Sequence, residues 1–135
     1  MAQENVEIVR HLLARWERGD YHHAGVFDPQ VLFTRTGGGS DVLGYMTESR
    51  GLVGLRAALQ AWTEEWTEVR VEAEQLLAVG ERVLALVRHS GLGRSSGVAL
   101  DHLDGWVFSF RDGRIARWDA YWNPAEARRA LDLSQ

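Results

Sequence analysis

The sequence predicts an α+β domain in which an antiparallel sheet buries one face against helices. Apolar residues in the first half of the chain recur at three- and four-residue steps, as they do along one side of an amphipathic helix. In the second half they alternate with polar residues and are interrupted by turn-forming sequences, as in a meander of strands. Helices followed by a run of strands is the order found in α+β folds.

The first half of the chain is predicted to form three helices and one strand. Gly19 suits the left-handed residue that follows a helix, and Asp28-Pro29 ends the next helix before the strand begins. A stretch with three consecutive glycines is predicted to be a loop, which contains Tyr45. In order, the expected elements are a helix over 4–18, a short helix over 21–27, a strand over 31–35, the loop over 36–49 and a helix over 52–66.

The second half is predicted to form a meander of strands and a short terminal helix. Its clearest feature is Asp112-Gly113, which joins two runs of alternating apolar residues, a pattern typical of a tight hairpin. Asn123 and Glu126 have the spacing of a helix capping box, with Pro124 at the first helical position. The expected strands span 69–79, 82–90, 98–110 and 115–122, and the helix ends at Leu131.

Composition excludes several classes of protein. A chain of 135 residues predicts one domain, and the lack of cysteine excludes disulfides, thiolate zinc sites and cysteine nucleophiles. The net charge of −4 and the scattered basic residues argue against a nucleic-acid partner. No apolar run reaches the roughly 18 residues of a membrane span, and the first residues lack a signal-peptide pattern, so we expect a cytoplasmic protein. No motif calls for a cofactor or a metal.

The alternation of the strands predicts which polar side chains face the helices. On the penultimate strand Asp104 shares a face with Trp106, and we expect both to point inward. We expect Arg35 and Arg88 to point inward as well, whereas His89 lies on the outward face. An arginine that Asp104 leaves unneutralised would recognise a carboxylate or enolate oxygen. Alternatively, Arg88 and Asp104 form an internal ion pair with no chemical role.

Four segments carry a resemblance to a known family. They are the first helix ending in ERGD, the strand DPQVLF, the helix RGLVGLRAALQAW and the hairpin FRDGRIARWDAYW. With these segments, nearly the whole chain resembles the nuclear transport factor 2-like superfamily, in its SnoaL-like and ketosteroid-isomerase-like branch. The resemblance implies a single SnoaL-like domain over 1–135, in which a cone-shaped curved sheet wraps helices around a deep apolar pocket. Members of the superfamily include isomerases, cyclases, dehydratases, hydrolases and binding modules.

The family's known catalytic residues do not carry over to this sequence. The positions that match the isomerase tyrosine, general base and second oxyanion donor are Leu12, Arg35 and Trp106, and an arginine cannot act as a base at neutral pH. The position that matches the aspartate of SnoaL-type cyclases is Ala120. Asp119 is one residue away, which on a strand means the opposite face.

We therefore expect a small-molecule-binding protein with an apolar, tryptophan-lined pocket. If the protein is an enzyme, the expected class is a lyase, isomerase or cyclase acting on a hydrophobic carbonyl compound. Asp104 would carry the proton, and Arg88 or Arg35 would stabilise the developing charge. The residues expected to line the pocket are Leu12, Trp16, Arg35, Tyr45, Leu59, Leu86, Arg88, Trp106, Phe108, Trp118, Ala120 and Trp122.

Two other functions fit the same sequence. One is a ligand binder without catalytic activity, and the other is a dimerisation or scaffold module whose cone is filled by side chains. A cavity below roughly 150 Å³, against about 300 Å³ or more in ligand sites, favours the filled cone. We also expect a homodimer through the outward face of the sheet, which is predicted to carry Ala85, Val87, Val107, Ser109 and Tyr121.

Overall fold

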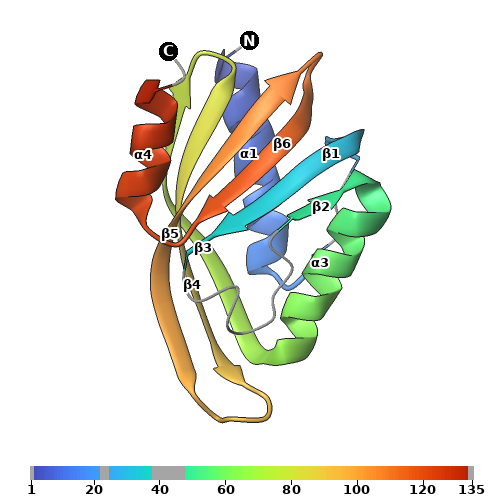
Figure 1. Cartoon of the computed structure of the whole chain (residues 1–135), viewed down its shortest axis with the longest axis vertical. Coiled ribbons are helices and arrows are strands. Elements are labelled where there is room, and N and C mark those ends of the chain that lie inside the picture. The colour runs from blue at the N-terminus through green and yellow to red at the C-terminus, as the bar shows by residue number, and fades with distance from the viewer. Residues whose placement is uncertain (1, 22–24, 38–47, 134–135) are drawn as a thin grey trace.

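A curved, open sheet wraps around two helices in the computed structural model of the chain (Figure 1). The structure describes residues 2–21, 25–37 and 48–133. In these residues the elements are α1 (Ala2–Glu17), β1 (Phe27–Thr36), β2 (Glu48–Arg50), α3 (Gly51–Glu65), β3 (Trp66–Val79), β4 (Arg82–Gly93), β5 (Ala99–Arg111), β6 (Arg114–Tyr121) and α4 (Pro124–Leu133). The predicted α+β class and the cone-like wrapping of helices by the sheet are confirmed.

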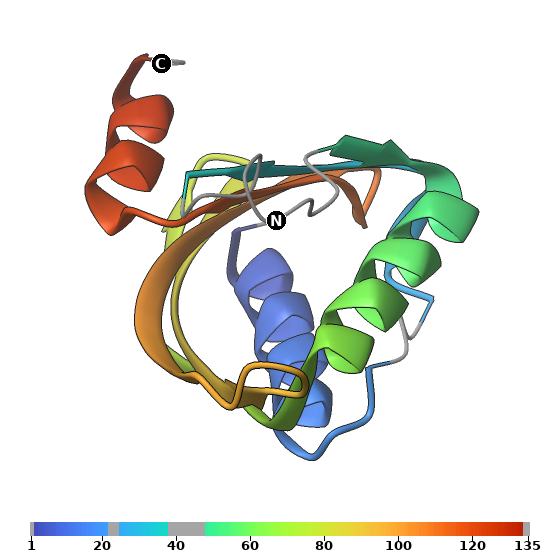
Figure 2. The same cartoon turned by 60° about the horizontal axis from the view of Figure 1, so that its bottom comes forward.

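The strand order in the sheet is β2-β1-β6-β5-β4-β3. Most neighbours are antiparallel, but β1 runs parallel to β6, so the sheet is mixed and not wholly antiparallel as expected. The last strand returns to the first after the chain has traversed the rest of the molecule, so no hairpin forces these two strands into opposite directions. Figure 2 shows α1 and α3 on the concave side of the sheet and α4 on the convex side.

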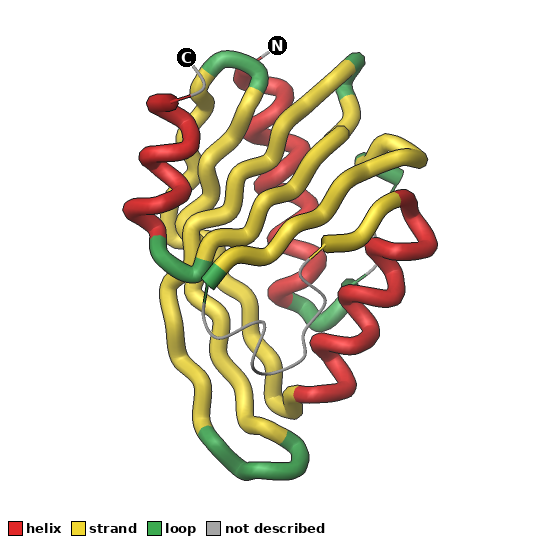
Figure 3. Tube along the Cα trace, in the orientation of Figure 1, coloured by secondary structure: helices red, strands yellow, loops and turns green. Residues whose placement is uncertain are grey.

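The concave side holds the main core. Five apolar residues of α1 are buried in one stripe against the sheet, namely Val6, Val9, Leu12, Leu13 and Trp16. Helix α3 adds Leu55 and Leu59 to this core. The apolar stripe of α1 is the reason why this helix lies inside the curve of the sheet. Strands β3, β4 and β5 extend well beyond the other strands (Figure 3).

Strand β4 is apolar on both faces, and this overturns one prediction. Val87 faces α1, while Leu86 packs with Ala127 and Leu131 of α4 on the convex side. Because the paired residues His89 and His102 share a face with Asp104 and Trp106, the register turns Arg88 outward. The predictions that Arg88 and Leu86 face inward and that His89 faces outward are therefore wrong, by one residue of register.

The ends of several elements also differ from the prediction. Of the short helix expected over 21–27, residues 22–24 lie outside the described residues, and Phe27 begins β1. Residues 48–50 form the short strand β2 against β1, where the sequence predicted a loop. The predicted pocket residue Tyr45 lies outside the described residues.

The hairpin and the helix cap that the sequence predicts near the C-terminus are both confirmed. Asp112 and Gly113 both have positive φ angles, 53° and 78°, as a tight hairpin of this kind requires. Asn123 caps α4 by accepting a hydrogen bond from the backbone N–H of Ala125 on its Oδ1 at 2.9 Å. Both signals depend only on local backbone geometry.

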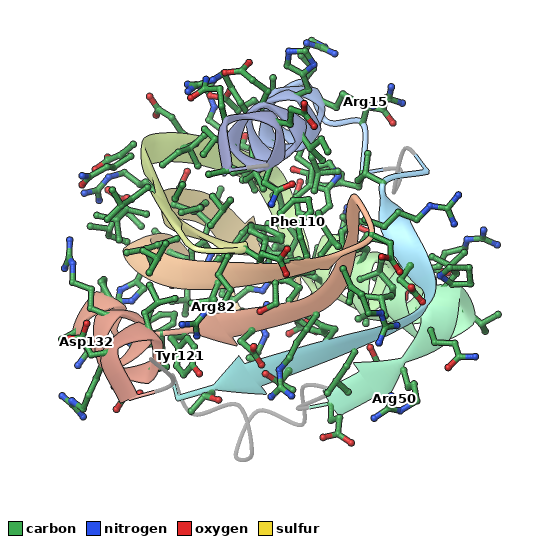
Figure 4. The ribbon with its side chains drawn as sticks, turned by 90° about the horizontal axis from the view of Figure 1, so that it is seen from above. Arg15, Arg50, Arg82, Phe110, Tyr121 and Asp132 are labelled. Carbon is green, nitrogen blue, oxygen red and sulfur yellow. The ribbon has the colours of Figure 1, made fainter. Side chains whose placement is uncertain are left out.

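The convex side of the sheet is partly covered by α4. Figure 4 shows Phe110 on the side of the sheet that faces α1, and Arg82 and Tyr121 on the side of α4. Arg82 donates a hydrogen bond to the carbonyl of Leu131 at 3.2 Å. Of the face expected to form a homodimer, Ala85 and Val87 are buried inside the cone, and Val107 and Tyr121 pack beneath α4.

No helix in the described part of the chain is long and apolar enough to span a bilayer.

Close packing of α4 on β5 gives a first test. A methyl group added at Gly105 would lie 2.7 Å from Cβ of Ala127 and 3.0 Å from Cα of Pro124. We expect Gly105→Ala to lower the free energy of unfolding by about 1–3 kcal/mol in urea denaturation, since α4 must move away. Adding Ala127→Gly should recover part of this loss, and strictly additive losses would contradict the assigned contact.

Candidate functional site

A small cavity lies inside the cone between α1, α3 and the inner face of the sheet. Its volume is about 40 Å³, below the limit that favours a filled cone. Its polar lining residues are Arg35, His89 and Asp104. Six aromatic side chains surround it, namely Trp16, Tyr21, Phe33, Trp62, Trp106 and Trp118, and α3 adds Ala58, Leu59 and Ala61.

Aromatic rings fill most of the cone. The ring of Trp118 lies at the centre, with ring centroids at 4.5 Å for Phe33, 5.0 Å for Trp106, 5.2 Å for Trp16 and 5.6 Å for Phe108. These separations are in the range in which offset and edge-to-face aromatic pairs are favourable. The cavity is what this packing leaves open next to His89 and Asp104.

A buried carboxylate and histidine form the polar centre of the site. Asp104 is 1% exposed and His89 is 3% exposed. Oδ1 of Asp104 lies 2.9 Å from Nε2 of His89, and Oδ2 accepts a hydrogen bond of 3.0 Å from the indole N–H of Trp106. An ionised carboxylate only accepts hydrogen bonds, so beside an ionised Asp104 the nitrogen Nε2 carries a proton, and in the neutral form of the ring Nδ1 is then an acceptor.

A second histidine connects this centre to the end of β6. Nε2 of His102 lies 2.7 Å from the backbone oxygen of Trp122 and 3.5 Å from Oδ1 of Asp104. The rings of His102 and Trp122 are stacked, with centroids 3.4 Å apart and planes 9° apart. The side chain of His102 is 26% exposed, so it lies between the buried carboxylate and solvent.

Three residues of the cavity wall each have a buried polar atom without a hydrogen-bond partner in the described part of the chain. These atoms are Nδ1 of His89, the hydroxyl of Tyr21 and the indole nitrogen of Trp118. Buried polar atoms are nearly always hydrogen-bonded, so three unpaired atoms on residues of one small cavity are unusual. Together they offer one acceptor and two donors to whatever enters the cavity.

Burial raises the pKa of the Tyr21 hydroxyl above its ordinary value of 10.0. The cause is desolvation, which disfavours the phenolate. Tyr21 is therefore a neutral donor at physiological pH, and its ring packs edge-on against Trp62 with centroids 5.8 Å apart.

Six predicted site residues lie on the cavity: Trp16, Arg35, Leu59, Asp104, Trp106 and Trp118. Leu12, Phe108 and Ala120 are buried in the core without lining it, and Trp122 stacks on His102. Leu86 and Arg88 lie on the convex face.

The structure excludes Arg88 from the cavity. Its guanidinium lies 2.8 Å from Glu74 and 3.2 Å from Asp101, and the side chain is 41% exposed. The hydrogen bond to Glu74, followed by the one to Asp101, raises the pKa of Arg88. Both predicted roles, a stabiliser in the pocket and an ion pair with Asp104, are therefore wrong.

Six of the cavity residues were not predicted from the sequence, namely Tyr21, Phe33, Ala58, Ala61, Trp62 and His89. Phe33 shares a strand face with Arg35, so alternation alone could have found it. Trp62 follows the apolar stripe of α3, where a core tryptophan and a cavity tryptophan give the same pattern. For Tyr21, in a short irregular segment, no sequence signal exists.

The fold and this enclosed aromatic site define a cone of the nuclear transport factor 2-like class. Residues 9–118 match the family described as the SnoaL-like domain, so the chain belongs to that family. No curated protein matches the sequence.

Several solved structures have the same fold. An NTF2-like protein of unknown function from Burkholderia pseudomallei has a TM-score of 0.78 at 20% identity, covering 95% of this chain and 97% of its own. TerC, co-crystallised with polyporic acid, has a TM-score of 0.75 at 15% identity, covering 96% and 98%. A protein from Jannaschia, provisionally assigned as a SnoaL-like polyketide cyclase, has a TM-score of 0.73 at 17% identity, covering 96% and 92%. At these identities the similarity establishes the fold alone.

The buried carboxylate allows a direct test. We expect Asp104→Leu to lower the free energy of unfolding by about 3–5 kcal/mol, because the donors of His89 and Trp106 lose their acceptor. The double variant His89→Leu with Asp104→Leu should be more stable than Asp104→Leu alone, since it removes the unpaired histidine. Urea unfolding measures both variants, and the outer-face variant Arg88→Met serves as the control. A double variant no more stable than the single one would contradict the pairing.

Alkaline pH tests the burial of Tyr21. Its raised pKa means that the native state still holds a proton which the unfolded state releases above about pH 10. The free energy of unfolding should therefore fall as pH rises through this value, and less steeply in Tyr21→Phe. Burial also raises the pKa of Tyr121, so this residue contributes to the same fall in the free energy of unfolding. The variant Tyr121→Phe would remove that contribution. Unfolding curves between pH 8 and 11 that are parallel for Tyr21→Phe and the unsubstituted chain would contradict this assignment.

Proposed function

We propose that the protein binds a small hydrophobic carbonyl compound and catalyses proton transfer at the carbon next to its carbonyl group. The observation that carries this proposal is the pair of His89 and Asp104. Nε2 of the histidine is held by the carboxylate at 2.9 Å, while its buried Nδ1 has no hydrogen-bond partner in the described part of the chain. Because His89 also lines the cavity, Nδ1 is the base that we assign to this reaction.

The proposed chemistry uses only the residues of the cavity. Nδ1 of His89 takes a proton from the carbon next to the carbonyl, and the electron pair of that C–H bond moves to the carbonyl oxygen. The indole N–H of Trp118 and the hydroxyl of Tyr21 are the donors available to the resulting enolate oxygen. His89 then returns the proton to another carbon of a conjugated enolate, as in an isomerase. In a cyclase the enolate carbon instead attacks a second carbonyl, and the oxygen of that carbonyl takes the proton from His89 as its double bond to carbon opens.

Asp104 has a different part in this proposal from the one that the sequence suggested. Both of its oxygens are occupied by hydrogen bonds from His89 and Trp106. A carboxylate so occupied holds the imidazole in one tautomer and stabilises the imidazolium, but does not carry the proton. Asp104 is therefore a positioning residue, and His89 is the proton carrier.

Two structures of the same fold are consistent with a ligand-binding function. TerC was crystallised with polyporic acid, and a protein from Catenulispora acidiphila with the ketosteroid isomerase-like fold was crystallised with trimethylamine. The assignment of the Jannaschia protein as a polyketide cyclase points to carbonyl chemistry. These relatives support ligand binding by this fold, and the carbonyl class of the ligand is our own proposal.

A second candidate is favoured by the volume of the cavity. At about 40 Å³ the cavity is smaller than typical ligand sites, as expected for a scaffold or dimerisation module with a filled cone. The homodimer, the lack of a nucleic-acid partner and the cytoplasmic location remain predictions.

Hydrogen exchange on a simple ketone separates the two candidates. With 4-phenylbutan-2-one in D2O, we expect the protein to accelerate deuterium incorporation next to the carbonyl, as followed by proton NMR. His89→Gln should slow this exchange at least about 100-fold, the usual contribution of a general base. His11→Gln, which changes a histidine that is 79% exposed on α1, should leave it unchanged. A protein that neither binds nor exchanges the ketone would favour the filled cone.

A further inference from the structure

A second concave space adjoins the cavity. An open groove of about 510 Å³ lies between the end of α1, the last turns of α3 and the start of β3. Tyr21 and Leu59 line both the groove and the cavity, so the two spaces share one wall. Figure 3 shows that α3 runs directly into β3, and both elements contribute residues to the groove.

The volume of the cavity limits how much of a ligand it can contain. At about 40 Å³ the cavity is far smaller than the roughly 300 Å³ or more of an ordinary ligand site, so it takes in only a small part of a hydrophobic ligand. Any compound whose carbonyl reaches His89 must therefore place most of its atoms elsewhere. The groove behind Tyr21 and Leu59 has the volume of an ordinary ligand site.

The groove is lined by two arginines from different elements. Arg56 comes from α3, and Arg94 follows β4. Arg94 is tied to the end of α3, because its backbone N–H donates to the carbonyl of Glu65 at 3.0 Å and its guanidinium to the carbonyl of Thr63 at 3.3 Å. Neither contact neutralises its charge.

One acidic side chain, Glu68, lines the groove beside these two arginines. Its φ of 55° and the irregular pairing between Thr67 and Arg70 mark a bulge in β3. The groove therefore has an excess of positive charge next to the ring of Trp66. Guanidinium groups beside an aromatic wall suit an aromatic or aliphatic compound that ends in a carboxylate.

We propose that the ligand is an elongated hydrophobic keto acid, with its ketone at His89 and its carboxylate between Arg56 and Arg94. This inference rests on the proposed function and specifies its substrate class. The ketone enters the cavity past Tyr21 and Leu59, and the chain and any ring lie in the groove against Trp66. The carboxylate fixes the register of the ketone relative to Nδ1 of His89.

A matched pair of compounds tests the charge requirement. The probes are 4-(3-oxobutyl)benzoic acid and its methyl ester, in which the ring lies between the ketone and the carboxyl group, and calorimetry measures their dissociation constants at 20 mM and at 300 mM salt. We expect the acid to bind at least about fivefold more tightly than the ester at low salt, with the advantage falling at high salt. Equal binding of acid and ester, or no binding of either, would overturn the proposal.

Arginine variants test where the carboxylate of the acid probe binds. Arg56→Gln and Arg94→Gln should each remove most of the acid's advantage and leave the ester unaffected. Arg128→Gln, on α4 away from the groove, is the matched control and should change neither. An acid preference that survives both groove substitutions would overturn the assignment of the groove.

The indole signal of Trp66 gives a readout that is independent of charge. We expect both probes to shift its resonance in nitrogen–proton NMR spectra, since both place their chains in the groove. Probes that bind without moving this signal would overturn the proposal.

The keto-acid proposal and the proposed proton transfer can fail independently of each other. Deuterium exchange that depends on His89 but shows no preference for the acid would refute the groove and leave the proton transfer standing. An acid preference that depends on Arg56 and Arg94, without exchange next to the ketone, would support the groove and refute the catalytic role.

Discussion

The buried carboxylate of Asp104 is the constraint on which the inner half of the sheet depends. A carboxylate that is 1% exposed is tolerated only when its oxygens are hydrogen-bonded. His89 on β4 and Trp106 on β5 supply those donors, so the two strands must keep the register that sets the three side chains on one face. The same hydrogen bonds fix the tautomer of His89 and the tilt of the indole of Trp106.

The tryptophans determine how much space remains around that carboxylate. Trp118 contacts Trp16, Phe33 and Trp106 from three different elements, and the stack of His102 on Trp122 closes the cone near the end of β6. Large rings packed in this way leave a space of about 40 Å³ in place of a deep pocket. The fold therefore provides a narrow inner cavity and a wide outer groove, and Tyr21 and Leu59 belong to the walls of both.

The sequence predicted the fold well and the site in part, and β4 explains the difference. The hairpin at Asp112-Gly113 and the alternation around Trp106 are local signals, and both were read correctly. In β4, Val83, Ala85 and Val87 face α1 while Leu84 and Leu86 face α4, so hydrophobicity does not alternate along the strand. Without alternation the sequence does not determine which residues of β4 face inward. An error of one residue therefore placed Arg88 inside the cone, where the structure has His89. The outer groove depends on contacts between distant elements, which spacing along the chain does not encode.

The polar atoms in the aromatic core distinguish a ligand site from simple packing. A scaffold with a filled cone would be more stable with apolar side chains at positions 21, 89 and 118, because each buried and unpaired polar atom costs about 1–3 kcal/mol. Here the three residues line the same small cavity, and one of them is a histidine whose other nitrogen is held by a buried carboxylate. A fold can carry such a cost where binding compensates for it. The small volume then limits the size of the group that enters, and the orientation of His89 indicates its chemistry.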